Sequence, residues 1–196
     1  MASVCHIAKL PVELLKIIFD DLIVATRQCP VALCAVYSRW RIIIGRCSRY
    51  WRTLVLRSTT TVPKIKQRIK LAGGEIQRLL VYGMETEQFF RLTPIFKPAL
   101  ENVDEVHFEA SRQHFFHVTN AGFLKCSPRI LIMRGVYTTK KACTPVGIPM
   151  MSKKLTELYI SSFDPTWNTF LGLTPSLKVL NVSCRFDEYH DWPSST

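Results

Sequence analysis

The chain is poor in several features that would assign it to a familiar class of protein. No run of about 18 uncharged apolar residues is present, so the sequence predicts no membrane span. The segment from Met1 to Lys9 lacks the basic, apolar and small-residue order of a secretory signal. None of the seven cysteines forms a CxxC pair. An odd, scattered set of this kind predicts free thiols in a reducing compartment, hence a cytoplasmic or nuclear protein.

Motifs for catalysis and for phosphate binding are also missing. The sequence contains no G-x-S-x-G motif, and no order of Ser, His and Asp or of Cys, His and Asn suggests a nucleophile. Gly73 and Gly74 precede an expected strand and do not open a helix, so they do not predict a phosphate-binding loop. We therefore expect no active site, no cofactor and a protein that is not an enzyme.

Four residues are candidate ligands of a metal site: His107, His114, His117 and Cys126. Their spacing fits no zinc pattern, and a structural zinc site needs four converging ligands. We therefore expect no bound metal.

Acidic residues are scarce relative to basic ones. The chain of 196 residues holds 26 Lys and Arg against 15 Asp and Glu, a net charge of +11. Most of the excess lies in the first 75 residues. A basic surface favours acidic partners, which leaves both nucleic acid and an acidic protein open.

What the chain has in abundance is apolar surface near its start. An expected helix from Pro11 to Ala25 opens with a proline, and Glu13 in its first turn suits the helix dipole. Its apolar residues spread over an arc of roughly 200°, against the ~100° stripe of an ordinary surface helix. Further helices are expected at Val31–Tyr37 and at Ser38–Cys47, with Ser38 as a candidate N-cap. Such a first helix needs cover on two sides, and another protein is a candidate for one of them.

This stretch resembles an F-box, the helical module that binds the Skp adaptor of cullin-based ubiquitin ligases. The resemblance is carried by Leu10-Pro11, Glu13-Leu14-Leu15, Ile18-Phe19, Leu22, Leu33-Cys34, Val36, Arg39-Trp40-Arg41, Ile43 and Trp51, and it covers about a quarter of the chain. It implies that residues 1–56 form an F-box and that the Skp adaptor is a partner. The adaptor contacts that it implies are Leu10, Pro11, Leu14, Leu15, Ile18, Phe19, Leu22, Val36 and Trp40.

A repeat follows the helices. An apolar–x–x–apolar–x–apolar pattern, first seen at Trp51/Leu54/Leu56, recurs at intervals of about 22–27 residues, inside the period of leucine-rich repeats. It predicts parallel strands near Leu54, Leu79, Val106, Leu131, Leu158 and Leu180. Helices are expected between them, among them Lys64–Ala72, Glu87–Leu92 and Thr166–Leu173. The asparagine of the leucine-rich pattern is absent, so the expected solenoid is irregular.

The expected fold is therefore of the α/β class: a small all-helical F-box module at 1–56, then a short irregular leucine-rich-repeat solenoid with a parallel β-sheet at 57–196. A solenoid needs a terminal cap with a polar outer face. The polar stretch Ser183–Thr196 is either a poor cap or a sign that the chain is a truncated version of a longer protein.

Side chains alternate between the two faces of a strand, so every second residue of each repeat should face the concave side. These residues mix aromatic, acidic and basic groups, which suits a protein target better than a uniformly basic phosphate-binding groove. The target-binding candidates are Arg78, Tyr82, Glu105, His107, Glu109, Arg134, Glu157 and Tyr159.

The resemblance thus implies a substrate-recognition adaptor of an SCF-type ubiquitin ligase, with the Skp adaptor, and through it a cullin, at one end and a target protein at the other. Two alternatives stay open: a basic nucleic-acid-binding module that uses Arg39 to Lys70, and an orphan repeat protein without a ligase role. The sequence names neither the target nor its degron.

Overall fold

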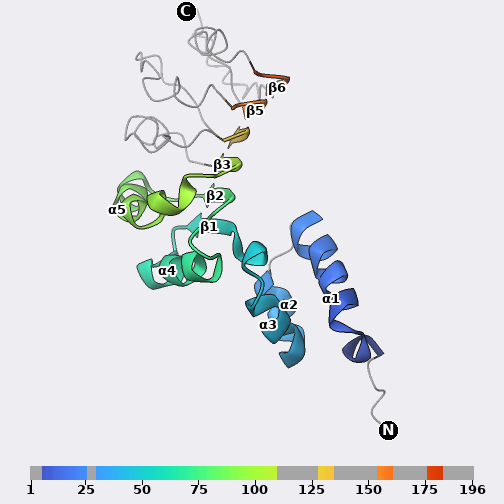
Figure 1. The fold of residues 1–196 in the computed structure, drawn as a ribbon. Helices are drawn as coiled ribbons and strands as arrows, with labels where there is room; N and C mark the ends of the chain where they lie inside the picture. The colour runs from blue at the N-terminus through green and yellow to red at the C-terminus, as the bar shows by residue number, and fades with distance from the viewer. Residues whose placement is uncertain (1–5, 26–29, 110–127, 135–153, 161–175, 183–196) are drawn as a thin grey trace, which may run out of the picture.

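The computed structural model describes residues 6–25, 30–109, 128–134, 154–160 and 176–182. A helical module comes first and is followed by a parallel sheet, with α4 and α5 lying along one side of that sheet (Figure 1). The module lies at the end of the sheet that begins with β1, and the strands then continue away from it in chain order. The expected mixed α/β class is confirmed.

Helices of the module follow the expected order with small shifts at their ends. They are η1 (His6–Lys9), α1 (Val12–Phe19), η2 (Asp20–Ala25), α2 (Pro30–Val36), α3 (Ser38–Gly45) and η3 (Ser48–Trp51). The helix expected from Pro11 to Ala25 is present as α1 plus η2, and η2 is a π-helical turn, a form that usually occurs as a single-turn insertion. Pro11 is the N-cap of α1 and not its first helical residue.

The expected N-cap at Ser38 is wrong. Tyr37 occupies the N-cap position of α3 with an extended backbone, and no side chain caps the helix there. Ser38 is the first helical residue. Tyr37 can take this position because an N-cap needs only non-helical dihedral angles, and the capping side chain is an addition to them.

The sheet has six strands in the order β1-β2-β3-β4-β5-β6, and every neighbouring pair is parallel. The strands are β1 (Thr53–Arg57), β2 (Arg78–Tyr82), β3 (Glu105–Glu109), β4 (Ile130–Arg134), β5 (Glu157–Ile160) and β6 (Val179–Val182). The six apolar residues predicted to mark the strands lie side by side in register: Leu54, Leu79, Val106, Leu131, Leu158 and Leu180. The prediction of one parallel sheet in chain order is confirmed.

Each of the connections between the first three strands contains one α-helix. The two helices are α4 (Val62–Leu71) and α5 (Thr86–Phe96), and α5 is followed by the short turn η4 (Lys97–Leu100). The predicted basic helix is therefore present and begins two residues early, with a proline in its first turn. It ends at Gly73 and Gly74, whose φ angles of 73° and 86° lie in the left-handed region that glycine tolerates. The helix expected at Thr166–Leu173 lies outside the described residues.

One continuous core joins the module to the sheet. It runs from Leu15 and Phe19 on α1 through Leu54 and Leu79 to Leu158 on β5. The expected boundary between the module and the sheet, at residue 56, falls inside β1. Because this strand pairs with β2, the whole of β1 belongs to the sheet. In the part of the chain that the structure describes, no helix has the length and apolar character needed to cross a membrane.

Candidate protein-interaction surfaces

The inner side of the module is closed by aromatic packing. Leu15 and Phe19 are completely buried. The ring of Phe19 lies edge to face against Trp40, with 5.3 Å between the ring centroids, and against Tyr50 at 6.5 Å. Leu15 and Phe19, both expected as adaptor contacts, therefore serve the interior of the module and offer a partner no surface.

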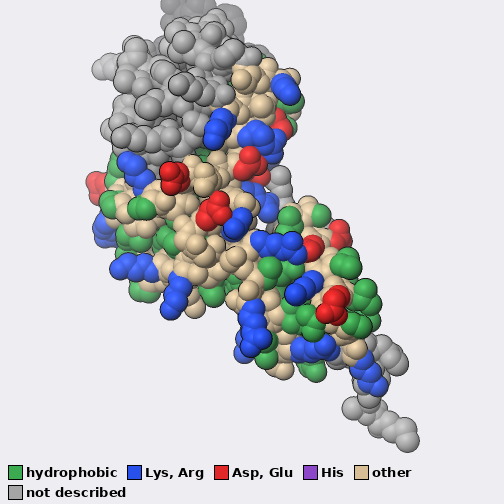
Figure 2. All heavy atoms as spheres, in the orientation of Figure 1, with side chains coloured by type: hydrophobic (Ala, Val, Ile, Leu, Met, Phe, Trp, Pro, Cys, Tyr) green, Lys and Arg blue, Asp and Glu red, His purple; other side chains and the backbone are tan. Residues whose placement is uncertain are grey.

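The outer side of the module leaves apolar side chains in solvent. Of the residues expected to contact the adaptor, Leu14 is 46% exposed, Val36 is 65% exposed, and Pro11 is exposed as well. Figure 2 shows hydrophobic side chains over the part of the surface that α1 occupies. The remaining expected contacts are half-buried: Leu10, Ile18, Leu22 and Trp40.

One exposed residue of this face was not among the expected contacts. Ile17 on α1 is 64% exposed, as much as any apolar side chain of that helix. The 3.6-residue period could have found it, because Ile17 follows Leu14 by three positions and the two side chains share one side of the helix.

A polar network ties the end of α1 to η3. The Tyr50 hydroxyl donates a hydrogen bond of 2.7 Å to Asp20 Oδ1, and Arg49 forms an ion pair with the same carboxylate. The Arg49 guanidinium also lies 5.3 Å from the centre of the Tyr50 ring. Burial, reinforced by the hydrogen bond to Asp20, raises the pKa of Tyr50 to about 12. The network therefore links the junction of α1 and η2 to η3.

Four of the expected target-binding residues come together beside the module. Arg78, Tyr82, Glu105 and His107 line a cavity of about 270 Å³, and Tyr50 of the module lines it as well. Tyr82 packs edge to face against His107 at 5.3 Å. Glu105 is only 3% exposed, so its expected role as an exposed contact is wrong, because its neighbours cover it.

The other four candidates do not reach this cavity. Glu109 and Arg134 are exposed at neighbouring positions of β3 and β4. Glu157 is held by its own chain: it accepts hydrogen bonds from Arg129 Nη1 at 3.0 Å and from the Tyr159 hydroxyl at 3.1 Å. The bond to Glu157 raises the pKa of Tyr159. The eight residues therefore do not form a single site.

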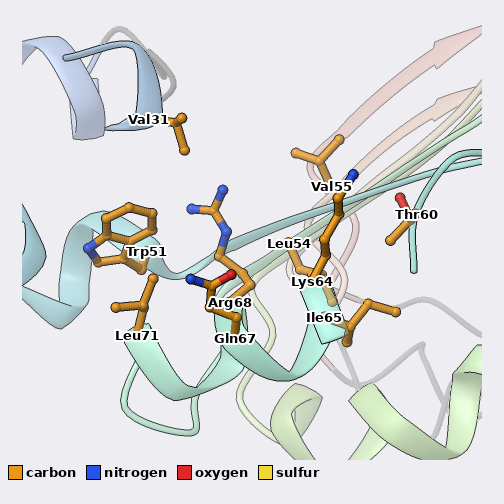
Figure 3. Close-up of a pocket in the computed structure, with 10 residues that line it drawn as sticks. All are labelled: Val31, Trp51, Leu54, Val55, Thr60, Lys64, Ile65, Gln67, Arg68 and Leu71. Atoms are coloured by element: carbon orange, nitrogen blue, oxygen red, sulfur yellow. The ribbon is translucent and has the colours of Figure 1, made fainter. Parts of the chain in front are cut away.

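A second cavity of about 420 Å³ lies between the module, β1 and α4 (Figure 3). Val31 of α2 faces Trp51 and Arg68 across it, and the Arg68 guanidinium lies 4.8 Å from the centre of the Trp51 ring. Lys64 and Val55 line its other end. Sequence reasoning missed this cavity, because it depends on how α2 packs relative to α4.

Metal-binding groups are scarce in the described segments. Among those residues, no group of three or more His, Cys, Asp or Glu side chains is placed to hold a metal ion. Three of the four candidate metal ligands lie outside the described residues: His114, His117 and Cys126.

Comparison with known proteins gives no relative: no family model, no curated protein and no solved structure matches this chain.

Proposed function

We propose that the chain is a substrate-recognition adaptor of an SCF-type ubiquitin ligase, which binds the Skp adaptor through its helical module and a target protein through its sheet. The observation that carries the proposal is the outer side of α1, where Leu14 and Ile17 are exposed while Leu15 and Phe19 fill the core. An eight-residue helix that carries apolar side chains on two opposite sides is typical of a helix that packs against its own core on one side and against a partner protein on the other.

Charge is consistent with this partner. The chain carries a net charge of +11, and the Skp adaptor that the resemblance implies is acidic. Basic side chains lie among the hydrophobic ones over the module in Figure 2. Complementary charge of this kind speeds association, while the apolar contact supplies most of the affinity.

The arrangement of the two surfaces gives the proposal its mechanism. The module and the sheet share one core, so a target on the sheet is held at a fixed distance from an adaptor on the module. Holding two partners on one body raises the local concentration of the target near the enzyme that transfers ubiquitin. The chain itself needs no active site for this function.

The test is co-purification with the Skp adaptor. Leu14→Ala combined with Ile18→Ala should weaken binding by roughly two orders of magnitude or more, since each buried side chain contributes ~1.5–3 kcal/mol. The matched control is Val179→Ala with Leu180→Ala, which removes two exposed apolar side chains of β6. Circular dichroism establishes that both variants are folded. A folded Leu14/Ile18 variant that co-purifies at the parent's yield would show that the F-box assignment of α1 is wrong.

A nucleic-acid-binding function is the second candidate, and α4 favours it. Lys64, Lys66 and Lys70 are exposed on this helix, which has no acidic residue in its first turn. Phosphate contacts lose affinity steeply with salt, whereas an apolar contact does so weakly. The salt dependence of binding therefore separates the two functions.

A further inference from the structure

The two cavities meet at the boundary between the module and the sheet. Both are lined by Val55 of β1 and Arg68 of α4. From there one extends past Val31 and Lys64, and the other past Arg78 and Tyr82. We call the combined depression the junction groove, defined by Val31, Val55, Lys64, Arg68, Arg78 and Tyr82.

The junction groove follows a strand that has a neighbour on one side only. β1 is the terminal strand of the sheet within the described residues, and β2 is the strand that pairs with it. Terminal strands are the places where an extended peptide adds to a sheet, with alternate side chains entering pockets on either side. Cavities of about 420 and 270 Å³ beside Val55 are large enough to take such side chains.

The charges around the groove favour an acidic occupant. Three cationic side chains line the two cavities: Lys64, Arg68 and Arg78. The carboxylate that the described lining contains is Glu105, which is 3% exposed and therefore lies beneath the surface. The lining therefore carries more positive than negative charge.

Apolar surface is interspersed between these cations. Val31 is 51% exposed, and Val55, which both cavities share, is 36% exposed. The Arg68 guanidinium lies against the Trp51 ring and points into the space that Val31 borders (Figure 3). A nucleic-acid backbone is best served by an uninterrupted run of cations, which the groove does not offer, whereas a peptide can place carboxylates and apolar side chains in alternation.

We infer that the junction groove binds an extended segment of the target protein in which Asp or Glu alternates with apolar residues. The inference rests on the proposed function, and it names the class of target that the adaptor recognises. Its recognition site is shared between the module and the sheet, so the target lies next to the part of the chain that holds the adaptor.

The test begins with selection of random dodecapeptides displayed on phage against the immobilised full chain. The enriched peptides should be acidic and apolar, and one of them, labelled with fluorescein, serves as the probe for anisotropy titrations. Arg68→Glu and Val31→Glu should each weaken its binding by about tenfold or more. The first reverses a positive charge of the groove, and the second places a new carboxylate next to the carboxylates of the bound peptide.

Matched controls carry the same changes away from the groove. Arg91→Glu alters an exposed cation of α5, and Val179→Glu alters an exposed valine of β6. Both should bind the probe as the parent does, and the milder Arg68→Gln replaces Arg68→Glu if the latter does not fold. The inference is overturned by a selection that yields no binder or only basic peptides, by unchanged binding in the groove variants, or by displacement of the probe by an oligonucleotide of mixed sequence.

The same proteins separate this inference from the proposed function. Arg68→Glu should retain co-purification with the Skp adaptor, while Leu14→Ala with Ile18→Ala should retain the peptide. Loss of the peptide result alone removes the junction groove as the target site and leaves the adaptor function in place. Loss of adaptor binding alone removes the ligase role and leaves a peptide-binding protein.

Discussion

The described residues include eleven large apolar side chains that are exposed. Eight of them belong to the helical module, between Ile7 and Ile42. The strands contribute the other three: Val55, Val179 and Leu180. Neighbouring strands of the sheet pair in parallel, and the buried side chains of β1 to β5 belong to one core with those of α4 and α5. The three short α-helices of the module, α1, α2 and α3, have no comparable series of neighbours, so each can bury one side only. The sheet therefore buries most of its large apolar side chains, whereas the module leaves eight of them exposed.

The largest effect should come from the buried side of α1. Phe19→Ala removes a completely buried ring that packs against Trp40 and Tyr50, and it should lower the free energy of unfolding by ~3–5 kcal/mol. Ile17→Ala, on the exposed side, should change it by no more than about 0.5 kcal/mol. Urea denaturation measures both. Similar losses of unfolding free energy in the two variants would contradict the division of α1 into a buried and an exposed side.

The sheet should show the same contrast between its interior and its last strand. Leu79→Ala on β2 removes a completely buried side chain and should cost ~2–5 kcal/mol. Leu180 occupies the corresponding register position on β6 but is 43% exposed, so Leu180→Ala should cost less than about 1 kcal/mol. Equal costs at both positions would mean that β6 is as well covered as β2.

An intermediate effect is expected from the network that closes the module. The pKa of Tyr50 is raised from 10.0 to about 12, so folding favours its neutral form. The associated stability is fully present below pH 10 and is lost as the pH rises toward 12, at most ~2–3 kcal/mol. Comparison of the unfolding free energy of the parent and Tyr50→Phe across this range measures it. A parent that loses no more stability than Tyr50→Phe would contradict the raised pKa.

The smallest effect belongs to the exposed ion pairs of the sheet. Arg129 donates to both carboxylate oxygens of Asp104 at 3.1 Å and to Glu157 at 3.0 Å. Since its side chain is 46% exposed, Arg129→Ala should cost no more than about 1 kcal/mol, and less at high salt. Thermal melts at two salt concentrations measure the cost. A larger, salt-independent loss would show that these pairs hold the strands in place.

The order and register of the strands could be predicted from the sequence because the pattern that marks them is local. Apolar side chains at the same place in each repeat can all enter one core only if the strands lie side by side in register. Leu79 and Val106 are therefore neighbours, as expected. Helix positions followed from the helical spacing of apolar residues: α1 begins one residue after Pro11, and α3 begins at Ser38 as expected, although Tyr37 is its N-cap.

The division of α1 into two sides could not be predicted in this way. A wide apolar arc does not say which of its residues meet the chain's own core, so the sequence predicts Leu15 and Phe19 as adaptor contacts although both are buried, and it does not single out the exposed Ile17. Long-range contacts were equally out of reach. Asp20 meets Tyr50 across 30 positions, and Glu105 is covered by neighbours that only the packed fold brings to it.

We expect the exposed side of α1 to form an apolar contact with the Skp adaptor. Calorimetric titration of the full chain with that adaptor, at several temperatures and two salt concentrations, tests it most directly. We expect binding with a negative heat-capacity change and a shallow salt dependence, and we expect this binding to be lost when Leu14 and Ile17 are both changed to alanine. Absence of binding, or binding that these two changes leave intact, would contradict it.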